Sequence, residues 1–392
     1  MARPLAGPQT LLRTLNGRAI LESLARRGPL TRAELMTETG LSRTAVTQVL
    51  RMLEGSDAVA AAGVDRDTRG PAAGRVSLHP ALGYAAAVHV EPSAAHVALV
   101  DATGAVRVET HGPFPPLGDR VDHIAGLIEA CLEKVHGPLH VAVIGVPGIV
   151  TADGAIRDDQ GPDGGAFRAA LSARLGAPVR IENDVNLAAL AELADGRGAE
   201  LASFALLLLD DGLGGGIVID GALHRGFSGV AGEITFLPQT PVPIGAPVLG
   251  DAVVRDLALA HGRDPEETVH QHLDAAAAGD EAALAMAAEM GRRLTIVAGS
   301  IALVLDPEAF ILGGVAAHPV LVDAVARVAE EYAAQLPMRF LVSSFGPEAP
   351  LVGAVQESAA ALRATVFSRL VPSVDRGASV DHGAAAVDRS VR

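Results

Sequence analysis

The sequence lacks what several protein classes require. Cys131 is the one cysteine among 392 residues, so neither an internal disulfide nor a cysteine-rich zinc site can form. No apolar run reaches the roughly 18 residues that a membrane-spanning helix needs. The first residues also lack the basic, apolar and small-residue order of a signal peptide. We therefore expect a cytoplasmic protein that does not act at a membrane.

Positive charge is scarce and unevenly spread. The net charge is −15, and Lys134 is the one lysine among the 31 basic residues. Residues 1–80 nevertheless contain 11 arginines against 7 acidic residues, a local charge of +4 that leaves −19 for the rest of the chain. This asymmetry indicates a basic module that faces an anion, attached to an acidic body.

The basic segment begins with helical patterns. Residues 1–13 are interpreted as a loose leader, after which the apolar positions of residues 15–27 fall on one helical face until Gly28-Pro29 ends the helix. Thr31 and Glu34 then have the spacing of a capping box, which predicts the start of a second, short helix.

A third helix is predicted after a glycine-containing turn. Gly40 stands where a left-handed residue ends the second helix, and Ser42 is placed to cap a helix that runs to about Leu53. Its apolar residues lie at i, i+3, i+4 and i+7, with polar and basic residues on the opposite face. Two short helices joined in this way are typical of a helix-turn-helix, whose second helix enters the major groove of DNA.

Two further strands would complete a wing. Residues 59–64 and 75–78 have strand patterns, and the basic tip between them offers Arg66 and Arg69 to phosphates or to the minor groove. With Arg75, these arginines are predicted to contact the DNA backbone. The alternative is a three-helix docking module with ordinary surface arginines.

The third helix is predicted to read bases through Arg43, Thr44, Thr47 and Gln48, since Arg prefers guanine and Gln prefers adenine. The full set assigned to DNA binding is Arg32, Ser42, Arg43, Thr44, Thr47, Gln48, Arg51, Arg66, Arg69 and Arg75.

After residue 80 the pattern becomes that of an α/β protein. Three strands are followed by alternating helices and strands, and a second segment repeats the theme, which favours two lobes with mostly parallel sheets. The small, polar tail is expected to be disordered. The expected boundaries are 10–80 for the winged helix-turn-helix, 81–195 and 196–367 for the lobes, and 371–392 for the tail.

A glycine-rich turn stands in the second lobe. Its strand runs into Asp210-Asp211-Gly212 and continues through Gly214-Gly-Gly216. Glycines let backbone N–H groups approach a phosphate closely, but two carboxylates at the mouth of the turn would repel it. The stretch has the shape of a phosphate loop and the opposite charge; the alternative is a β-hairpin with two solvated aspartates.

Taken in order, the motifs resemble the ROK family of sugar kinases and sugar-responsive repressors. The resemblance covers about residues 10–365 and implies an actin-like, ribonuclease-H-like domain of two α/β lobes with a sugar cleft between them. The N-terminal winged helix distinguishes the repressors of this family from its kinases. The motifs are Gly145-Val-Pro-Gly148, Glu182-Asn-Asp-Val-Asn186, Gly212-Leu-Gly-Gly-Gly216, Gly221-Ala-Leu-His-Arg-Gly226, Ala231-Gly-Glu233 and Asp306-Pro-Glu-Ala-Phe-Ile-Leu-Gly-Gly314.

The departures from the family fall in the chemistry of the kinases. Where these kinases have an Asp followed one residue later by Gly-Gly-Thr, this sequence reads His89-Val-Glu91-Pro92-Ser93, and Asp210-Asp211 replaces the usual Gly-Thr of the second loop. Both phosphate loops have gained an acid. We therefore expect no MgATP site, no enzymatic activity and no cofactor.

The resemblance also implies a zinc site, built from a histidine after the Ala-Gly-Glu motif and from a cysteine cluster. Phe236 occupies that histidine position and residues 238–249 contain no cysteine, so no metal is expected. The same histidine is a sugar ligand in the family, and its loss bears on effector binding.

Asn183, Asp184, Glu233 and Asp251 remain as candidates for effector binding. Carboxylates and an amide accept hydrogen bonds from paired sugar hydroxyls. In a kinase Asp184 would be the general base on the sugar hydroxyl; without a phosphoryl donor it would only hold that hydroxyl. Asp251 stands where the family has another sugar-binding acid. The alternative is that Asn183 and Asp184 cap a helix and Glu233 is a turn residue.

The sequence thus predicts a nucleoid-associated transcriptional regulator of carbohydrate metabolism. It would act as a repressor on a double-stranded, palindromic operator, as a homodimer or homotetramer. A sugar or sugar derivative in a catalytically inactive cleft would change its operator affinity. The competing hypotheses are a ROK-type sugar kinase with a fused regulatory head and a regulator that has lost its small-molecule effector.

Overall fold

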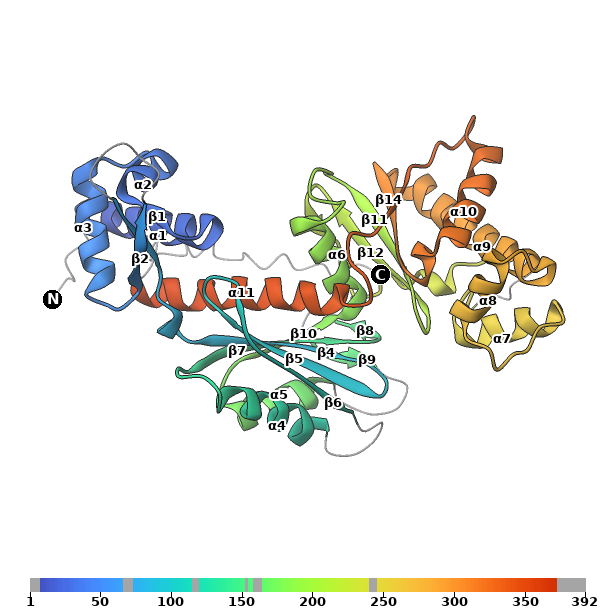
Figure 1. The fold of residues 1–392 in the computed structure, drawn as a ribbon, viewed down its shortest axis with the longest axis horizontal. Helices are drawn as coiled ribbons and strands as arrows, with labels where there is room; N and C mark the ends of the chain where they lie inside the picture. Colours follow the sequence, from blue (N-terminus) through green and yellow to red (C-terminus); the bar gives the residue numbers. More distant parts are fainter. Residues whose placement is uncertain are drawn as a thin grey trace, which may run out of the picture. The chain divides into compact units, whose positions relative to one another are not determined.

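The computed structural model describes residues 8–65, 73–114, 120–151, 154–157, 164–239 and 245–371. The chain forms two compact units (Figure 1): one contains residues 1–82 and the chain from 363 onward, and the other contains residues 83–362. Within the described ranges no helix is both long and apolar enough to cross a membrane.

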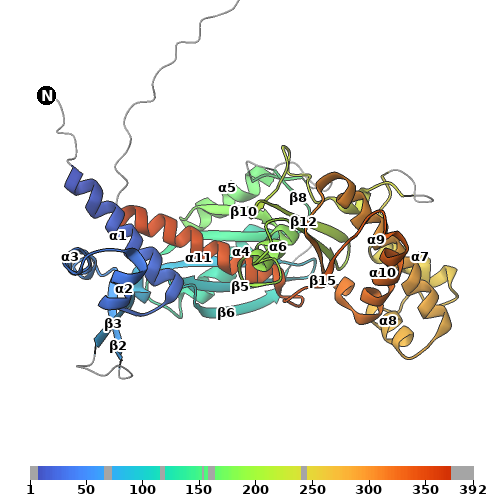
Figure 2. The ribbon, with the colours of Figure 1, turned by 90° about the horizontal axis from the view of Figure 1, so that it is seen from above.

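The first unit is a winged helix-turn-helix. Its elements are α1 (Pro8–Arg27), β1 (Leu30–Thr31), α2 (Arg32–Thr39), α3 (Arg43–Glu54), β2 (Val59–Asp65) and β3 (Ala73–Leu78). The strands form an antiparallel sheet in the order β1-β3-β2, and the β2–β3 hairpin projects from the helices as a wing (Figure 2).

The helix ends follow the local signals of the sequence. The Thr31 hydroxyl accepts from the Glu34 N–H while the Glu34 carboxylate accepts from the Thr31 N–H, which completes the predicted capping box. Gly40 ends α2 in the left-handed region, at φ 67°. Ser42 caps α3 by accepting from the Ala45 N–H.

The start of α1 differs from the expectation. The segment interpreted as a loose leader is helical from Pro8 onward. The predicted helix began too late: Leu12, before its predicted start, is 56% exposed, and burial is complete only further along, at Ile20 and Leu21. The periodicity of apolar residues predicts only the part of a helix whose side chains pack in a core.

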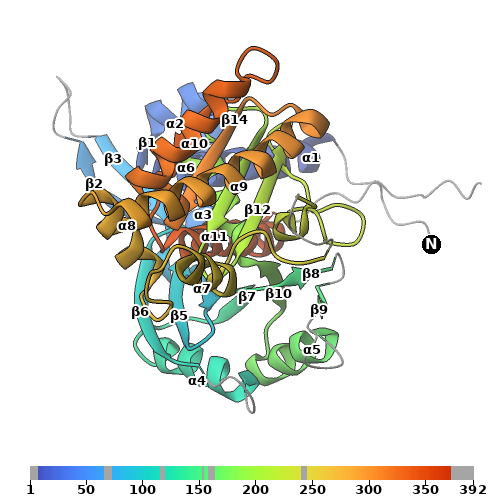
Figure 3. The same cartoon turned by 90° about the vertical axis from the view of Figure 1, so that its right-hand side faces the viewer.

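The first lobe of the larger unit is a five-stranded sheet in the order β10-β7-β4-β5-β6. Helices α4 and α5 cover one face, and α6 and α11 lie on the other, as the views in Figures 1 and 3 show. A short β8–β9 hairpin, which the sequence did not indicate, lies beside β10. The elements are β4 (Tyr84–Val90), β5 (Ala94–Asp101), β6 (Val106–Pro113), α4 (Arg120–Leu132), β7 (Leu139–Val146), β8 (Ile149–Val150), β9 (Ile156–Arg157), α5 (Gly164–Leu175), β10 (Val179–Asn183) and α6 (Asp184–Asp195).

The prediction of a mostly parallel sheet was wrong for this lobe. The pairs β10–β7 and β7–β4 are parallel, but β4–β5 and β5–β6 are antiparallel. Only short turns connect β4 to β5 and β5 to β6, and a parallel pair needs a longer crossover.

The second lobe has the sheet order β13-β12-β11-β14-β15. Its meander is again antiparallel, while β14 and β15 run parallel to β11. A large core joins this sheet to α7, α8, α9 and α10. The elements are β11 (Phe204–Leu209), β12 (Leu213–Ile219), β13 (Ala222–Leu223), α7 (Asp251–Ala260), α8 (Val269–Ala277), α9 (Glu281–Leu305), β14 (Ala309–Gly314), α10 (Pro319–Tyr332), β15 (Phe340–Val342) and α11 (Ala349–Leu370), with single 3-10 turns at Ile234–Phe236 and Val315–Ala317. A further 3-10 turn, Pro80–Leu82, belongs to the smaller unit.

Helix α11 extends beyond the second lobe. Ala349 packs in the core of the second sheet, whereas Ala354 and Ala359 pack against the first sheet. The Ser358 hydroxyl donates to the Ala86 carbonyl of β4. The helix therefore ties the two lobes together before its last residues enter the smaller unit.

The glycine run proves to be a packed strand. The segment around Asp210-Asp211 is a tight β11–β12 hairpin, the alternative that the sequence left open. A Cβ on Gly214 would lie 2.5 Å from Val185, and one on Gly216 would lie 2.4 Å from the Ala189 Cβ. These glycines let α6 approach the sheet closely, so their presence is explained without a phosphate.

Candidate functional site

Helix α3 presents a polar face opposite its buried face. Val46 and Leu50 are fully buried against the other helices. Arg43, Thr44 and Gln48 are exposed on the other side. Their donors and acceptors are therefore exposed to solvent, and base reading by these residues stays a prediction.

The remaining residues predicted to bind DNA differ in their surroundings. Arg32 and Arg51 are exposed. Thr47 is half-buried and its hydroxyl donates to the Arg43 carbonyl, while the Ser42 hydroxyl is used as a helix cap. Arg66 and Arg69 lie outside the described residues.

Arg75 is bound within its own unit. Its guanidinium donates to the Pro29 carbonyl at 2.9 Å and forms an ion pair with Glu34 at 3.4 Å. These contacts attach β3 to the start of α2. A DNA backbone contact by Arg75 stays a prediction.

Asn183 and Asp184 lie at the junction of β10 and α6. The Asn183 side chain caps α6 by accepting from the Asn186 N–H, and its amide donates to the Gly148 carbonyl and to Asp184. Asp184 also accepts from the Val185 N–H at 2.8 Å. The capping role left open by the sequence is confirmed for Asn183.

Glu233 is positioned by the glycine before it. Gly232 has φ 100°, and its carbonyl accepts from the Gly215 N–H, so closely that a Cβ on Gly232 would lie 2.0 Å from the Gly215 carbonyl oxygen. Only glycine fits there. The Glu233 side chain makes no capping bond to the short helix that it precedes. Its carboxylate is therefore free of that structural task.

The structure brings Asp184, Glu233 and Asp210 together. Burial raises the pKa of Asp184 to about 7, and the charges of Asp210 and Glu233 add to the rise against the opposing bonds to backbone N–H groups. Burial also raises the pKa of Glu233. The carboxylates of Asp210 and Glu233 therefore lie close enough to Asp184 for their charges to act on it. Such a cluster accepts hydrogen bonds from hydroxyl groups and resists a further negative charge.

The acidic hairpin turn and the other degenerate phosphate loop also meet. Desolvation raises the pKa of Asp210 to about 6, and the charges of Asp211 and Glu91 contribute in the same direction, while His270 opposes them. Glu91 belongs to the segment after β4 and Asp210 to the turn after β11. The two acids that the sequence identified in separate loops therefore lie close enough for their charges to interact.

Three histidines lie side by side on the strands that lead to Glu91. His89 and His96 have ring centroids 6.5 Å apart, and His96 and His111 stack at 5.6 Å. Burial, and then the charge of His96, lower the pKa of His89 to about 4. The buried His89 is therefore neutral at physiological pH.

Asp251 is placed beside the acidic turn. It is exposed at the first residue of α7, and its N–H donates to the Asp211 carbonyl at 2.9 Å. No recorded contact joins it to Asn183, Asp184 or Glu233. Its role in effector binding stays a prediction.

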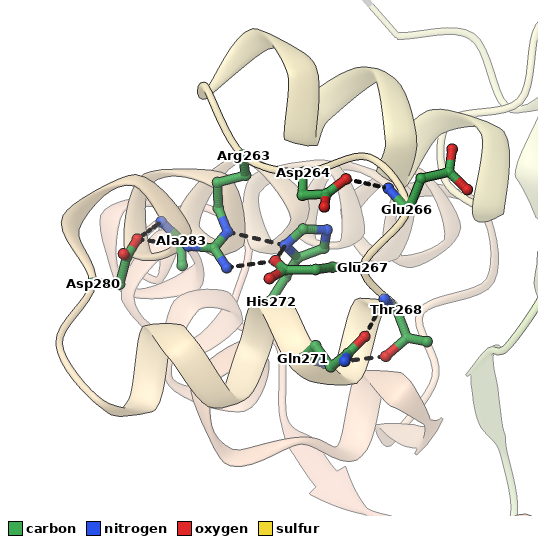
Figure 4. Close-up of polar contacts among 9 residues, drawn as sticks. All are labelled: Arg263, Asp264, Glu266, Glu267, Thr268, Gln271, His272, Asp280 and Ala283. Carbon is green, nitrogen blue, oxygen red and sulfur yellow. Dashed lines mark hydrogen bonds and ion pairs between the residues drawn. The ribbon is translucent and has the colours of Figure 1, made fainter.

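A polar network fixes the helix that carries His270 (Figure 4). Arg263 donates to the buried His272 Nδ1 at 3.0 Å and forms ion pairs with Glu267 and Asp280. Burial, and then the Arg263 charge, lower the pKa of His272. Because Thr268 also caps α8, the start of this helix is held rigidly near the acidic turn.

Among the described residues, no three His, Cys, Asp or Glu side chains converge as metal ligands do. Phe236, at the position of the family's zinc-binding histidine, is 50% exposed.

An ion pair between the two lobes was not predicted from the sequence. Arg225, after β13, binds the Glu182 carboxylate through Nε at 2.7 Å and Nη2 at 2.6 Å. Glu182 also accepts from the Asn183 N–H and from the Asn186 amide. The signal was present, since Glu182 and Arg225 both belong to motifs that resemble the family, but their pairing depends on the approach of the two lobes.

Comparison with known proteins separates the chain into two parts. Residues 13–58 match a family of winged helix-turn-helix DNA-binding domains. Residues 87–358, more than half of the chain, match the ROK family. The chain belongs to the ROK family.

Relatives within the family include kinases and regulators. An N-acetyl-D-glucosamine kinase of Vibrio vulnificus is 32% identical over 222 residues, which cover 50% of this chain and 71% of the kinase. The xylose repressor of Bacillus subtilis is 23% identical over 58% of this chain and 61% of the repressor. The chain spans about half, 47%, of the length of a curated relative from Clostridium perfringens.

A solved structure of similar organisation is a ROK family transcriptional regulator, a homologue of the E. coli MLC protein. It aligns with a TM-score of 0.73 at 22% identity, over 92% of this chain and 99% of that one. At this level of identity the likeness shows the fold.

Proposed function

We propose that this protein is a DNA-binding transcriptional regulator, acting as a repressor, whose operator affinity responds to a sugar or sugar derivative. The observation that carries the proposal is the outer face of α3, where Arg43, Thr44 and Gln48 are exposed on a helix that is anchored by its buried face. A xylose repressor stands among the relatives of the chain.

The cleft supports sugar binding without phosphoryl transfer. Asp184 and Glu233 offer acceptors for hydroxyl groups. Glu91, Asp210 and Asp211 occupy the loops that would hold the phosphates of ATP, and the first two of these acids interact with each other. Bringing a polyphosphate into this region would add like charges at short range in a partly desolvated site. We therefore propose that the domain is a receptor and not an enzyme.

Ligand control would follow from a preference for one arrangement of the lobes. A sugar that contacts Asp184 and Glu233 would shift the protein toward the arrangement that it binds more tightly. A homodimer or homotetramer would present two recognition helices to a palindromic operator, in the cytoplasm and on the nucleoid.

DNA selection tests the first half of the proposal. The full chain is used to select duplexes from a random pool, and binding of the selected duplex is compared for the wild type, Arg43→Ala and Arg18→Ala. Arg18 is an exposed arginine of α1, paired with Glu22 one turn away, and is the matched control for charge removal. We expect Arg43→Ala to lose operator affinity and Arg18→Ala to retain it. Equal losses in both variants, or no selected sequence, would contradict the proposal.

Ligand binding and catalysis are tested on the same preparation. Neutral sugars, amino sugars and sugar phosphates are screened for an increase in unfolding temperature, since a ligand that binds the native state stabilises it. Asp184→Asn should weaken any sugar that uses the cleft. Release of ADP from ATP in the presence of any hexose of the panel would favour the sugar kinase, and turnover that is lost in Asp184→Asn would establish it.

A further inference from the structure

A cavity lies within residues 83–362, along β10 at the edge of the first sheet. Its volume is about 280 Å³, and its walls come from the β8–β9 hairpin, α5, β10 and α11, with Arg225 added from the second lobe. Neither Asp184 nor Glu233 lines it, so it is distinct from the group of carboxylates described above. The charged residues in its lining are Arg168, Arg180, Arg225, Glu182 and Glu357.

Arg168 brings an unsatisfied donor to this cavity. Its Nε is buried and has no hydrogen-bond partner among the described residues. Gly154 of the hairpin lies against the side chain, so that a Cβ on Gly154 would be 3.2 Å from the Arg168 Cδ. A buried donor without an acceptor costs about 1–3 kcal/mol. A ligand that supplied an acceptor would recover this cost.

The other charges favour an anionic ligand. The Glu182 carboxylate is already bound by Arg225, the Asn183 N–H and the Asn186 amide, which satisfies it and neutralises Arg225. Arg180 is exposed and Glu357 half-buried, and neither forms an ion pair with another described residue. Two arginines thus face one free carboxylate.

We propose that this cavity binds a small organic anion that also carries hydroxyl groups, namely a sugar phosphate or a sugar acid. Its phosphate or carboxylate would lie against Arg168 and Arg180, because guanidinium groups bind these oxygens with two parallel hydrogen bonds. A hydroxyl group would donate to Glu357. The volume is near the lower end of the roughly 300–1,000 Å³ of small-molecule sites, which suits a monosaccharide derivative.

The position of Glu357 links this site to regulation, a step that rests on the proposed function. Glu357 precedes Ser358, which anchors α11 to the first sheet through the Ala86 carbonyl. The same helix continues to Leu370, and its last residues belong to the unit that contains the winged helix. A ligand on Glu357 therefore contacts the helix that leads into that unit.

Calorimetric titration of the full chain without DNA tests the site. The probes are glucose 6-phosphate, gluconate, glucose and inorganic phosphate. The variants are Arg168→Gln, Arg180→Gln, Glu357→Gln and, as a matched control on α5, Arg174→Gln, whose exposed guanidinium pairs with Glu129 and Asp122 outside the cavity. Asp184→Asn removes the negative charge of the other cleft.

We expect glucose 6-phosphate, gluconate or both to bind. Binding of the first would show that the site takes a phosphate group, and binding of the second that it takes a carboxylate. Loss of a charged hydrogen bond should weaken that binding roughly tenfold or more in Arg168→Gln, with smaller losses in Arg180→Gln and Glu357→Gln. Arg174→Gln should bind these anions as the wild type does, and any binding of glucose should be unchanged in Arg168→Gln.

Binding that is unchanged in both Arg168→Gln and Arg180→Gln, or that is lost only in Asp184→Asn, would overturn the proposal. Inorganic phosphate that binds as tightly as glucose 6-phosphate would overturn the role of Glu357. If Arg168→Gln shows no cooperative unfolding transition and therefore does not fold, the affinity of Arg180→Gln, whose substituted residue is exposed, tests the proposal instead. Because the calorimetric titration contains no DNA, its outcome does not depend on operator binding. A negative result in either experiment therefore does not alter the interpretation of the other.

Discussion

The outer face of α3 and the cleft of the ROK domain both gather polar side chains, but they differ in charge and burial. On α3, Arg43 and Gln48 are exposed and no carboxylate stands among the residues assigned to DNA. In the ROK domain, burial raises the pKa values of Asp184, Asp210 and Glu233, and the charges of neighbouring acids add to the rise for Asp184 and Asp210. The face proposed to bind DNA thus presents a cation and an amide, whereas the ROK domain gathers carboxylates.

This difference explains how a kinase-like domain serves a DNA-binding protein. The glycines that pack β12 against α6 are retained because the fold requires them. Asp210, in the turn after β11, and Glu91, after β4, are not among these packed glycines. Under the proposed function, the residues that pack the fold therefore differ from the acids that would exclude phosphates.

The largest effect is expected when the cleft loses a carboxylate. The pKa of Asp184 is about 7 in the folded protein against an ordinary value of 3.8, so the folded state binds this proton more tightly and loses stability as pH rises from about 4 to about 7. Asp184→Asn should therefore be more stable than the wild type above pH 7, by at most a few kcal/mol, since a tenfold change in acidity equals about 1.4 kcal/mol. The advantage should vanish near pH 4.

Urea unfolding across this pH range measures the effect. Asp122→Asn is the control, because the Asp122 side chain is 69% exposed. A stability difference between Asp184→Asn and the wild type that does not change with pH would refute the burial of this charge.

The recognition face is tested next. Gln48→Ala should cost about 1–3 kcal/mol on the selected operator and relax specificity at one base pair, since a bidentate contact to adenine would be lost. Fluorescence anisotropy with the selected duplex and with random DNA gives both affinities. Equal losses on the two duplexes would show that Gln48 does not read a base.

Arg75 separates a structural from a DNA-binding role. Arg75→Gln removes the donor to the Pro29 carbonyl and the ion pair with Glu34, which should lower the stability of the winged unit by about 1 kcal/mol. If Arg75 also contacts a phosphate, the slope of the logarithm of the DNA-binding constant against the logarithm of the salt concentration should become less steep by about one in Arg75→Gln, because about one counterion fewer is released. DNA titrations at several salt concentrations measure this slope. If it is the same in Arg75→Gln and the wild type, Arg75 has a structural role only.

The smallest effect is expected at the acidic turn. The pKa of Asp210 is raised to about 6, so Asp210→Asn should also gain stability over the wild type as pH rises from about 4 to 6, and by less than Asp184→Asn because the pKa of Asp184 is raised further, to about 7. The same urea series measures it. A gain equal to that of Asp184→Asn would contradict the difference in burial between the two acids.

The amino-acid sequence by itself determined what depends on neighbouring residues. The caps at Thr31 and Ser42, the left-handed Gly40 and the apolar face of α3 involve contacts within a few residues, so spacing alone predicted them. The position of Asn183 and Asp184 at a strand–helix junction followed from the same local logic. The family motifs further predicted the two-lobed domain.

The tertiary structure alone decided what depends on distant segments. The antiparallel β4–β5–β6 meander, the bond from Asp251 to Asp211, and the pairing of Glu182 with Arg225 join residues whose contact no local pattern encodes. The cavity at Arg168 likewise needs α5, β10 and α11 in place. Residue spacing along the chain predicts local hydrogen bonds and the buried face of a helix or strand. Contacts between two acids, or between a cation and its carboxylate, depend on how whole sheets and helices pack.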